Sequence, residues 1–444
     1  ENEDVFNIKI NSGVIYAGAT PSTCTAIGGG GNGDTKITIN GGTITAVTNS
    51  TGAAIGGGTG QVQPGGIGNV TINGGHYENQ GEGSDLIYAS AAGNIIINGG
   101  TFKACPKESG VSGTNETYSA LNLKDNTSSH ITVYGGSFYK FNPADNKSEN
   151  PKVNFVADGY KVIYNNEWYV VVPEETDMIV SNASELAAKL TEAGASKINT
   201  TIFISKDIDM TGQTWTPINV QGYTGAGVVT ILGNNCTITG LTSPLFAGGF
   251  AGKSGIVIKD LTIADSHIVS TNTIGSGAFI ETVDSMSEIT LVNCHVKNSS
   301  ITGGSGSRTG GLIGWTAGYN NVNDGPVKTY VNIKDCSVTN CTITCDGSVG
   351  GIYGHAGNNA WTYSTVENCT VTGCNLNSTD DGEWRVGVVV GTANVGELTI
   401  NNITESGNTL TQTGKTAPAG QSNLYGRFVP GTTGKLVIDG VEIK

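Results

Sequence analysis

Charged side chains are scarce in this sequence. Only 14% of its 444 residues are Asp, Glu, Lys or Arg, compared with roughly a quarter in ordinary soluble domains. Only three are arginines: Arg308, Arg385 and Arg427. Because helix surfaces are built largely from charged residues, this shortage excludes helical bundles and coiled coils. The formal net charge of −14 also provides no basic surface for nucleic acid or for an anionic membrane.

Long apolar runs are missing as well. The longest, around residues 386–390, has the length of a strand and falls far short of the roughly 20 residues that a membrane-spanning helix needs. We therefore expect no membrane insertion. The sequence starts at Glu1 without a signal peptide, so we expect any secretion signal or surface anchor to lie outside these residues.

Glycine is abundant, with 67 residues, and Asn, Thr and Ser accompany it. This mixture is typical of short strands joined by tight turns, so we expect an all-β fold. In the first third of the chain, a short alternating strand ends repeatedly in a polar residue and a glycine turn. The last glycines of these repeats are Gly13, Gly42, Gly75, Gly100 and Gly136, which lie 29, 33, 25 and 36 residues apart. A constant strand with a variable spacer predicts a solenoid in which each repeat forms one coil.

Alignment of these repeats predicts columns of equivalent side chains in successive coils. The period-2 alternation directs one column inward, and its members are Ile15, Ile44, Tyr77, Phe102 and Phe138. A second column stands at the corners and contains Asn11, Asn40, Asn73 and Asn98. Stacked amides at a corner normally bond one another and their own backbone, so we interpret this column as structural.

Two local signals divide the chain near residue 175. Residues 160–172 are typical of two strands around a turn, a hairpin that would close the open edge of the first solenoid. A helix is then expected over residues 183–193, with Asn182 as its N-cap and Gly194 at its end. We predict a first domain over residues 1–175 and a second domain over 176–444, which this helix caps.

A different repeat begins near residue 200. One column of the second repeat contains Cys236, Leu261, Cys294, Cys336, Cys369 and Ile403. A glycine-rich segment recurs once in each of three successive repeats, at residues 311–314, 351–354 and 387–391. Cysteines in parallel, in-register columns point the same way, so we expect buried thiols rather than disulfides. No zinc-ligand spacing is present among the nine cysteines, nor metal-ligand spacing among the five histidines.

These repeats resemble known families. The second half is similar to the GLUG-motif repeats of bacterial surface proteins, and both halves resemble right-handed parallel β-helices of the pectate-lyase-like superfamily. The first half, with Ala-Ile-Gly-Gly-Gly at 26–30 and again at 54–58, is similar to non-catalytic carbohydrate-binding β-helix domains on bacterial cell surfaces. The resemblance implies two consecutive right-handed parallel β-helical domains.

Enzymes of that superfamily act on polyuronates. The lyases need a calcium cluster of carboxylates with a Lys or Arg base, and the hydrolases need two or three close aspartates. One short segment here has a cluster of charged residues, which are Asp380, Asp381, Glu383 and Arg385. Such a run in a spacer is usually a solvated loop, and we predict no catalytic residues. We expect no cofactor, with calcium as the candidate ion, and leave any metal site unassigned.

Aromatic residues give the best functional indication. Five of them lie in the spacers of three successive coils, among amides and carboxylates: Trp315, Tyr319, Trp361, Tyr363 and Trp384. Sugar rings stack on aromatic faces while amides and carboxylates bond the hydroxyl groups, so these five residues and the 380–385 constellation form a candidate glycan site. We expect the three tryptophans to leave the core at equivalent places and to share one face. The alternative is that they only cover coil corners.

The function favoured by the sequence is that of a secreted or cell-surface bacterial protein without catalytic activity, an adhesin or carbohydrate-binding protein. Its expected partners are glycans or host cell-surface ligands, with neutral glycans the first to test. Two alternatives stay open: a polysaccharide lyase or hydrolase of the β-helix type, and a passive surface stalk.

Overall fold

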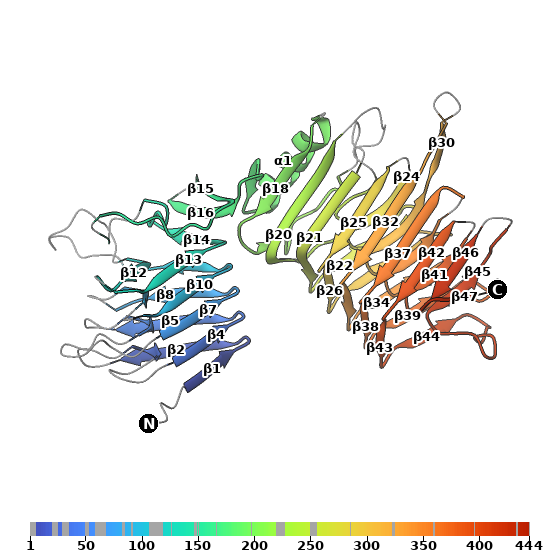
Figure 1. The fold of residues 1–444 in the computed structure, drawn as a ribbon. Coiled ribbons are helices and arrows are strands. Elements are labelled where there is room, and N and C mark those ends of the chain that lie inside the picture. Colours follow the sequence, from blue (N-terminus) through green and yellow to red (C-terminus); the bar gives the residue numbers. More distant parts are fainter. Residues whose placement is uncertain are drawn as a thin grey trace. The chain divides into compact units, whose positions relative to one another are not determined.

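The computed structural model is an all-β protein, with a single helix among the residues that it describes (Figure 1). It describes residues 6–19, 25–28, 35–48, 53–57, 68–81, 85–89, 92–105, 119–125, 127–145, 149, 151–165, 167–196, 198–218, 227–248, 255–284, 286–321, 325–357, 360–394, 396–431 and 434–443. The chain divides into two compact units, Glu1–Thr176 and Asp177–Lys444.

The first unit is a solenoid of three sheets whose strands from successive coils pair in parallel. Sheet A contains β1 (Phe6–Ile10), β4 (Thr35–Ile39), β7 (Gly68–Ile72), β10 (Asn94–Ile97) and β13 (His130–Val133). Sheet B contains β2 (Val14–Ala19), β5 (Thr43–Thr48), β8 (His76–Asn79), β11 (Thr101–Lys103) and β14 (Gly136–Tyr139), with β15 (Tyr160–Asn165) and β16 (Trp168–Pro173) at its end. Sheet C contains β3 (Ile27–Gly28), β6 (Ile55–Gly56), β9 (Ile87–Ala89) and β12 (Leu121–Leu123).

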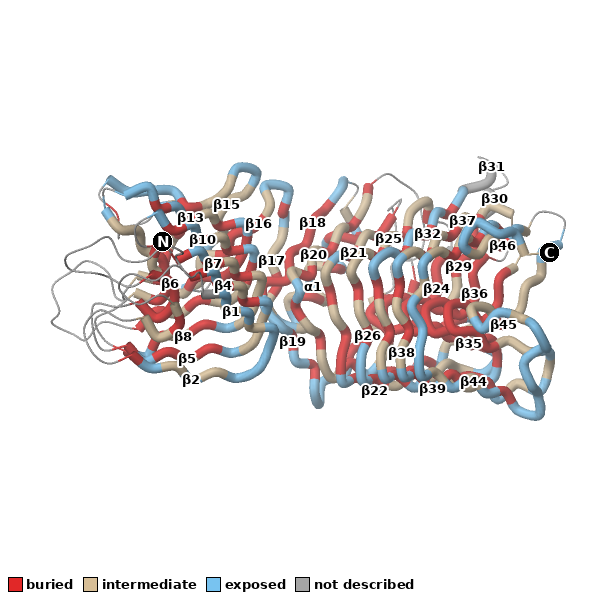
Figure 2. The backbone as a smooth tube through the Cα atoms, turned by 60° about the horizontal axis from the view of Figure 1, so that its bottom comes forward, coloured by how far each residue is buried: buried red, intermediate tan, exposed pale blue. Residues whose placement is uncertain are grey.

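The predicted inward column is confirmed. Each member pairs in register with the next, from Ile15 to Phe138. The rings of Tyr77, Phe102 and Phe138 stack with centroids 5.0 and 4.8 Å apart, and Phe102 has no exposed surface. The buried residues of this unit recur at the same place in each coil (Figure 2).

The asparagine column is also confirmed as a ladder of side-chain amides. The Nδ2 atoms of Asn40, Asn73 and Asn98 each donate to the Oδ1 atom of the asparagine one coil earlier, at 2.8 Å. Every donor points in the same direction along the solenoid. The amides satisfy one another, which supports the structural interpretation of this column.

A hairpin lies at the end of sheet B. Strands β15 and β16 are antiparallel, and β16 also pairs in antiparallel register with β14. The edge of β14 is thereby covered, and Val171 of β16 is fully buried against the core. An otherwise open parallel edge is removed.

The helix of the second unit, α1 (Ala183–Ala195), follows its predicted N-terminal signals. The Asn182 side chain accepts the N–H of Glu185 at 2.9 Å, while the carboxylate of Glu185 accepts the N–H of Ser181 at 2.7 Å. The predicted end at Gly194 is wrong. Gly194 is a buried helical residue, and the chain leaves the helix through Ser196 in an extended conformation, which requires no glycine.

The second unit stacks its strands into one large sheet and three smaller ones. Sheet E contains β17 (Met178–Val180), β18 (Thr200–Ile204), β19 (Ile208–Asp209), β20 (Val228–Thr239), β21 (Gly255–Ala264), β25 (Glu288–Val292), β26 (His295–Lys297), β32 (Thr329–Lys334), β33 (Ser337–Thr339), β37 (Thr362–Glu367), β38 (Thr370–Thr372), β42 (Glu397–Asn401), β43 (Thr404–Ser406), β46 (Lys435–Ile438) and β47 (Val441–Ile443). Sheet G contains β22 (His267–Val269), β27 (Ser300–Thr302), β34 (Thr342–Cys345), β39 (Asn375–Ser378) and β44 (Thr409–Gln412).

The two remaining sheets follow sheet G along each coil. Sheet H contains β23 (Gly275–Ser276), β28 (Arg308–Gly310), β35 (Ser348–Gly350) and β40 (Val386–Gly387). Sheet F contains β24 (Ile280–Asp284), β29 (Ile313–Ala317), β36 (Tyr353–Ala356), β41 (Val390–Ala393) and β45 (Tyr425–Phe428). A separate hairpin joins β30 (Tyr319–Asn321) to β31 (Gly325–Val327).

The cysteines of the second unit are buried free thiols, as predicted. They are Cys236, Cys294, Cys336, Cys341, Cys345, Cys369 and Cys374. Desolvation raises the pKa of the Cys236 thiol far above its usual range. Cys236 is therefore a small core residue rather than a nucleophile. Cys24 lies outside the described residues.

Asparagine and aspartate occupy the corners that precede the cysteine column. Asp260, Asn293, Asp335 and Asn368 all adopt the left-handed conformation, with φ between 52° and 55°. Asn293 donates to Asp260 at 2.7 Å and Asn368 donates to Asp335 at 3.1 Å. These two residue types tolerate left-handed backbone better than other non-glycine residues. A second polar ladder therefore forms at these corners.

Among the described residues, no helix is both long and apolar enough to cross a membrane.

Replacement of Phe102 by Ala should destabilise the first unit by about 3–5 kcal/mol, because it removes a fully buried ring from the middle of the stack. Urea denaturation measures the change in unfolding free energy. Tyr16→Ala is the matched control, since Tyr16 is 81% exposed and lies on strand β2 of the same sheet. Equal stability of the two variants would contradict the stacking.

Thiol titration tests the cysteine columns. Native protein should react slowly with a thiol reagent because the seven thiols of the second unit are buried. After denaturation without reductant, at least these seven should react. Recovery of only one or two would reveal disulfides in place of the columns.

Candidate functional site

The three predicted tryptophans lie in different parts of the coil. Trp315 is inside strand β29 of sheet F, Trp361 is in the turn before β37 of sheet E, and Trp384 is in the segment between β39 and β40. All three are partly exposed. The expectation of one shared face is wrong, because Trp315 lies within a strand of sheet F, whereas Trp361 and Trp384 lie outside strands at two different places along the coil.

The two predicted tyrosines are also in strands. Tyr319 begins β30 of the small hairpin. Tyr363 is in β37, where its ring stacks on Tyr330 of β32 with centroids 5.3 Å apart, and the Lys328 ammonium lies 5.5 Å from the Tyr363 ring centre. Tyr330 is 45% exposed and was not among the sequence candidates. Alignment of Tyr363 with its partner one coil earlier could have identified it.

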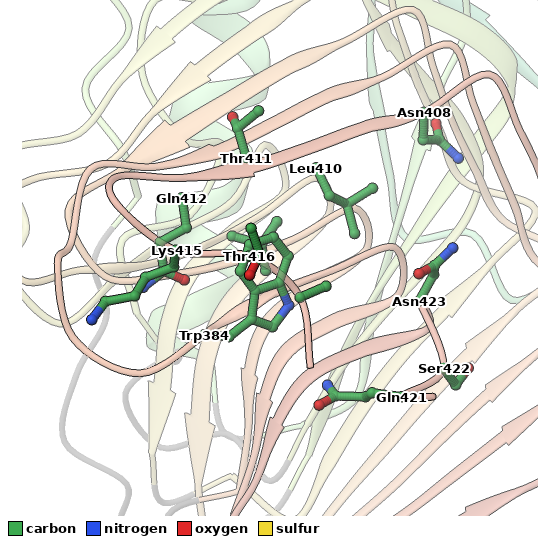
Figure 3. A pocket seen from close by; sticks show the side chains of 12 residues that line it. Trp384, Asn408, Leu410, Thr411, Gln412, Lys415, Thr416, Gln421, Ser422 and Asn423 are labelled. Carbon is green, nitrogen blue, oxygen red and sulfur yellow. The ribbon is translucent and has the colours of Figure 1, made fainter. Parts of the chain in front are cut away.

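Trp384 lines a pocket of about 450 Å³ (Figure 3). Part of the tryptophan packs against the core of the second unit. The other walls come from the end of β44 and from the chain between β44 and β45. The lining residues are Trp384, Val386, Asn408, Leu410, Thr411, Gln412, Lys415, Thr416, Ala417, Gln421, Ser422 and Asn423.

Gln412 fixes the segment that contains Trp384. Its side chain is buried, and its Oε1 atom accepts the backbone N–H of Arg385 at 2.7 Å. Its Nε2 atom donates to the backbone carbonyl of Glu383 at 2.8 Å. One amide thus holds the backbone on both sides of Trp384. No sequence motif pointed to Gln412, because its partners lie one coil away.

The polar residues of the pocket fall into two groups. The amides of Asn408 and Gln421 are engaged with protein carbonyls. The side chains of Lys415, Thr416 and Asn423 make no hydrogen bond or ion pair with a described residue. An ammonium, a hydroxyl and an amide beside an aromatic ring are groups that can bond the hydroxyls of a ligand.

The predicted acidic constellation is largely occupied by ion pairs. Arg385 lies 3.3 Å from Asp380, and Arg427 lies 2.6 Å from Glu383. Asp380 also accepts the N–H of Gly382 at 3.1 Å, which closes a turn. Asp381 is exposed. Within the described ranges, no group of three or more His, Cys, Asp or Glu side chains is arranged to hold a metal ion.

Comparisons with known proteins give little. No family model matches the chain, and no curated protein matches it. A solved structure, described as "a putative immunoglobulin A1 protease from Bacteroides ovatus", is 15% identical, with a TM-score of 0.39 over 60% of this chain and 78% of that one. A likeness this distant supports no statement about activity. The GLUG resemblance stays a prediction.

Replacement of Gln412 by Ala should destabilise the second unit by about 1–3 kcal/mol, because it leaves two part-buried backbone groups beside Trp384 without their hydrogen-bond partner. Urea denaturation followed by tryptophan fluorescence measures this. Thr409→Ala, an exposed change on the same strand, should have little effect. The assigned role of Gln412 fails if both variants are equally stable.

Proposed function

We propose that this protein binds glycans without catalysis and that the Trp384 pocket is its binding site. The observation that carries the proposal is the combination of a partly exposed tryptophan with three uncommitted polar side chains in one pocket. Its volume of about 450 Å³ lies within the roughly 300–1,000 Å³ typical of small-ligand sites. Sugars offer an apolar ring face for Trp384 and hydroxyls for Lys415, Thr416 and Asn423.

The paired carboxylates support binding rather than catalysis. A glycoside hydrolase needs one free acid and one free base at a set separation. Asp380 and Glu383 are instead each paired with an arginine. We therefore rank the polysaccharide lyase or hydrolase second, and the passive stalk third, because a stalk has no use for such a pocket.

We further propose that the protein is secreted or displayed on a bacterial cell surface, as an adhesin or carbohydrate-binding protein. We also propose that the chain forms two consecutive right-handed parallel β-helices and that the second contains GLUG-like repeats. Support for the handedness comes from the general rule that crossovers between parallel strands of one sheet are right-handed. No basic surface suits nucleic acid, since the net charge is −14.

A glycan array, run with and without calcium, tests the proposal. The Lys415→Ala/Thr416→Ala/Asn423→Ala variant should lose most of the binding, since these side chains have no structural partner and their removal leaves the fold intact. Trp384→Ala should weaken binding by about 5-fold, as expected for one stacked ring worth about 1 kcal/mol. Tyr16→Ala, an exposed aromatic change in the first unit, is the control.

Three results would contradict the proposal. Array binding that is the same in the pocket variants and in the parent would place the site elsewhere. Release of shortened or unsaturated sugars from a bound polysaccharide would favour the enzyme. Failure of the parent to bind any glycan, with or without calcium, would favour the stalk.

A further inference from the structure

All three arginines of the chain lie in or next to strands of sheets H and F. In sheet H, Arg308 pairs in register with Gly275 on one side and with Ser348 on the other. Arg385 immediately precedes β40, whose Val386 pairs with Val349, so Arg385 follows Ser348 in the same column. This column therefore alternates arginine and serine over three successive coils.

A second column runs along sheet F. Trp315 pairs with His355, His355 pairs with Thr392, and Thr392 pairs with Arg427. The short glycine-rich turns between the two sheets bring their backbones close together. A Cβ atom added at Gly354 would lie 2.5 Å from the carbonyl carbon of Arg308, so this close approach requires glycine.

The two columns contact each other with a constant offset. The hydroxyls of Ser348 and Thr392 lie 2.7 Å apart. Two coils earlier, a Cβ atom added at Gly275 would lie 2.8 Å from the Cβ of Trp315. Because Arg308 lies one coil before Ser348 and His355 lies one coil before Thr392, the same offset places Arg308 beside His355.

The continuation of this offset places Arg385 beside Arg427. We call this set the arginine patch; its members are Trp315, Arg308, His355, Ser348, Thr392, Arg385 and Arg427.

Three nitrogen atoms of this patch are buried without a hydrogen-bond partner. His355 is only 6% exposed, yet neither of its ring nitrogens has a hydrogen-bond partner. The Nε atom of Arg385 is buried without a hydrogen bond as well. Buried polar groups normally have partners, so these unpartnered nitrogens make the patch a candidate binding site.

The charge of the patch is also incompletely balanced. Asp380 and Glu383 neutralise Arg385 and Arg427. The partly exposed guanidinium of Arg308 makes no ion pair or hydrogen bond with any residue that the structure describes. One positive charge is therefore left over in a protein whose net charge is −14.

The imidazole of His355 is neutral at neutral pH. Burial and then the charge of Arg308 lower its pKa to about 3, against a weaker opposing effect of the Gly357 backbone. A neutral ring offers one N–H donor and one acceptor. It adds no charge of its own, so the attraction for a ligand comes from the arginines.

We propose that the arginine patch binds the oxyanion of an acidic sugar, a carboxylate or a sulfate ester. The planar guanidinium of Arg308 matches two oxygens of such a group. The buried ring of His355 lies beside that guanidinium, so its signal reports on an anion bound there. Trp315, partly exposed in the same column, provides a face for the sugar ring. The claim that a sugar carries this oxyanion rests on the proposed function, whereas the oxyanion site itself does not.

Nuclear magnetic resonance of ¹⁵N-histidine-labelled full-length protein tests this site, with the His355 signal assigned from a His355→Gln variant. The probes are sodium glucuronate, glucose 6-sulfate and glucose, added separately. The His355 signal should shift with one or both anionic sugars and not with glucose. Glucuronate and glucose 6-sulfate distinguish the carboxylate from the sulfate as the source of the oxyanion.

Variants at Arg308 link the shift to the patch. Arg308→Gln should weaken anion affinity about 10-fold or more, because a charge-assisted hydrogen-bond donor is lost. Arg308→Lys keeps the charge without the planar fork, so the loss should be smaller. Lys334→Gln, a half-exposed lysine on sheet E, is the matched control and should bind as the parent does.

The proposal is overturned if no anionic sugar shifts the His355 signal, if glucose shifts it equally, or if Arg308→Gln binds as tightly as Lys334→Gln. The Lys415→Ala/Thr416→Ala/Asn423→Ala variant separates this site from the Trp384 pocket. It should retain the His355 response, so failure of the glycan proposal and failure of the oxyanion site would be observed independently.

Discussion

The structure depends on one constraint: the strands of a coil pair in parallel register with the equivalent strands of the next coil. Adjacent strands lie about 4.8 Å apart, so side chains in a column are always in contact. This contact stabilises apolar columns such as that of Phe102. In the amide columns, each side chain forms a hydrogen bond with its neighbour. Like charges would repel. The arginine column obeys the constraint because Ser348 separates Arg308 from Arg385, which doubles the spacing between the two charges.

Most of the columns could be predicted from the sequence, because register repeats a residue type at regular places. Phe102, Asn73 and Cys336 were all assigned correctly by alignment of repeats alone. The site could not be predicted in this way. Trp384 was singled out for its residue type, but its pocket is built from the chain after β44, whose spacing belongs to no repeat. Gln412 contributes through contacts one coil away, which leave no local pattern.

The errors have physical causes. Glycine ends a helix only where the chain must turn left-handed, and the chain leaves α1 through an extended Ser196, so Gly194 had no such role. The tryptophans were assigned to one face because their spacers succeed one another. Trp315, however, lies within strand β29 rather than in a spacer, while Trp361 lies in the turn before β37. The arginine patch was overlooked because its residues are far apart in sequence and converge only through the offset between sheets H and F.

The asparagine ladder of the first unit has a direction: each amide donates to the coil before it and accepts from the coil after it. A coil inserted between Asn40 and Asn73 would meet an acceptor on one side and a donor on the other, the same surroundings that every existing coil has. Gene duplication can therefore lengthen such a solenoid one coil at a time, without compensating changes in the neighbouring coils. The unequal repeat lengths show where variation accumulates, in the loops rather than in the ladder.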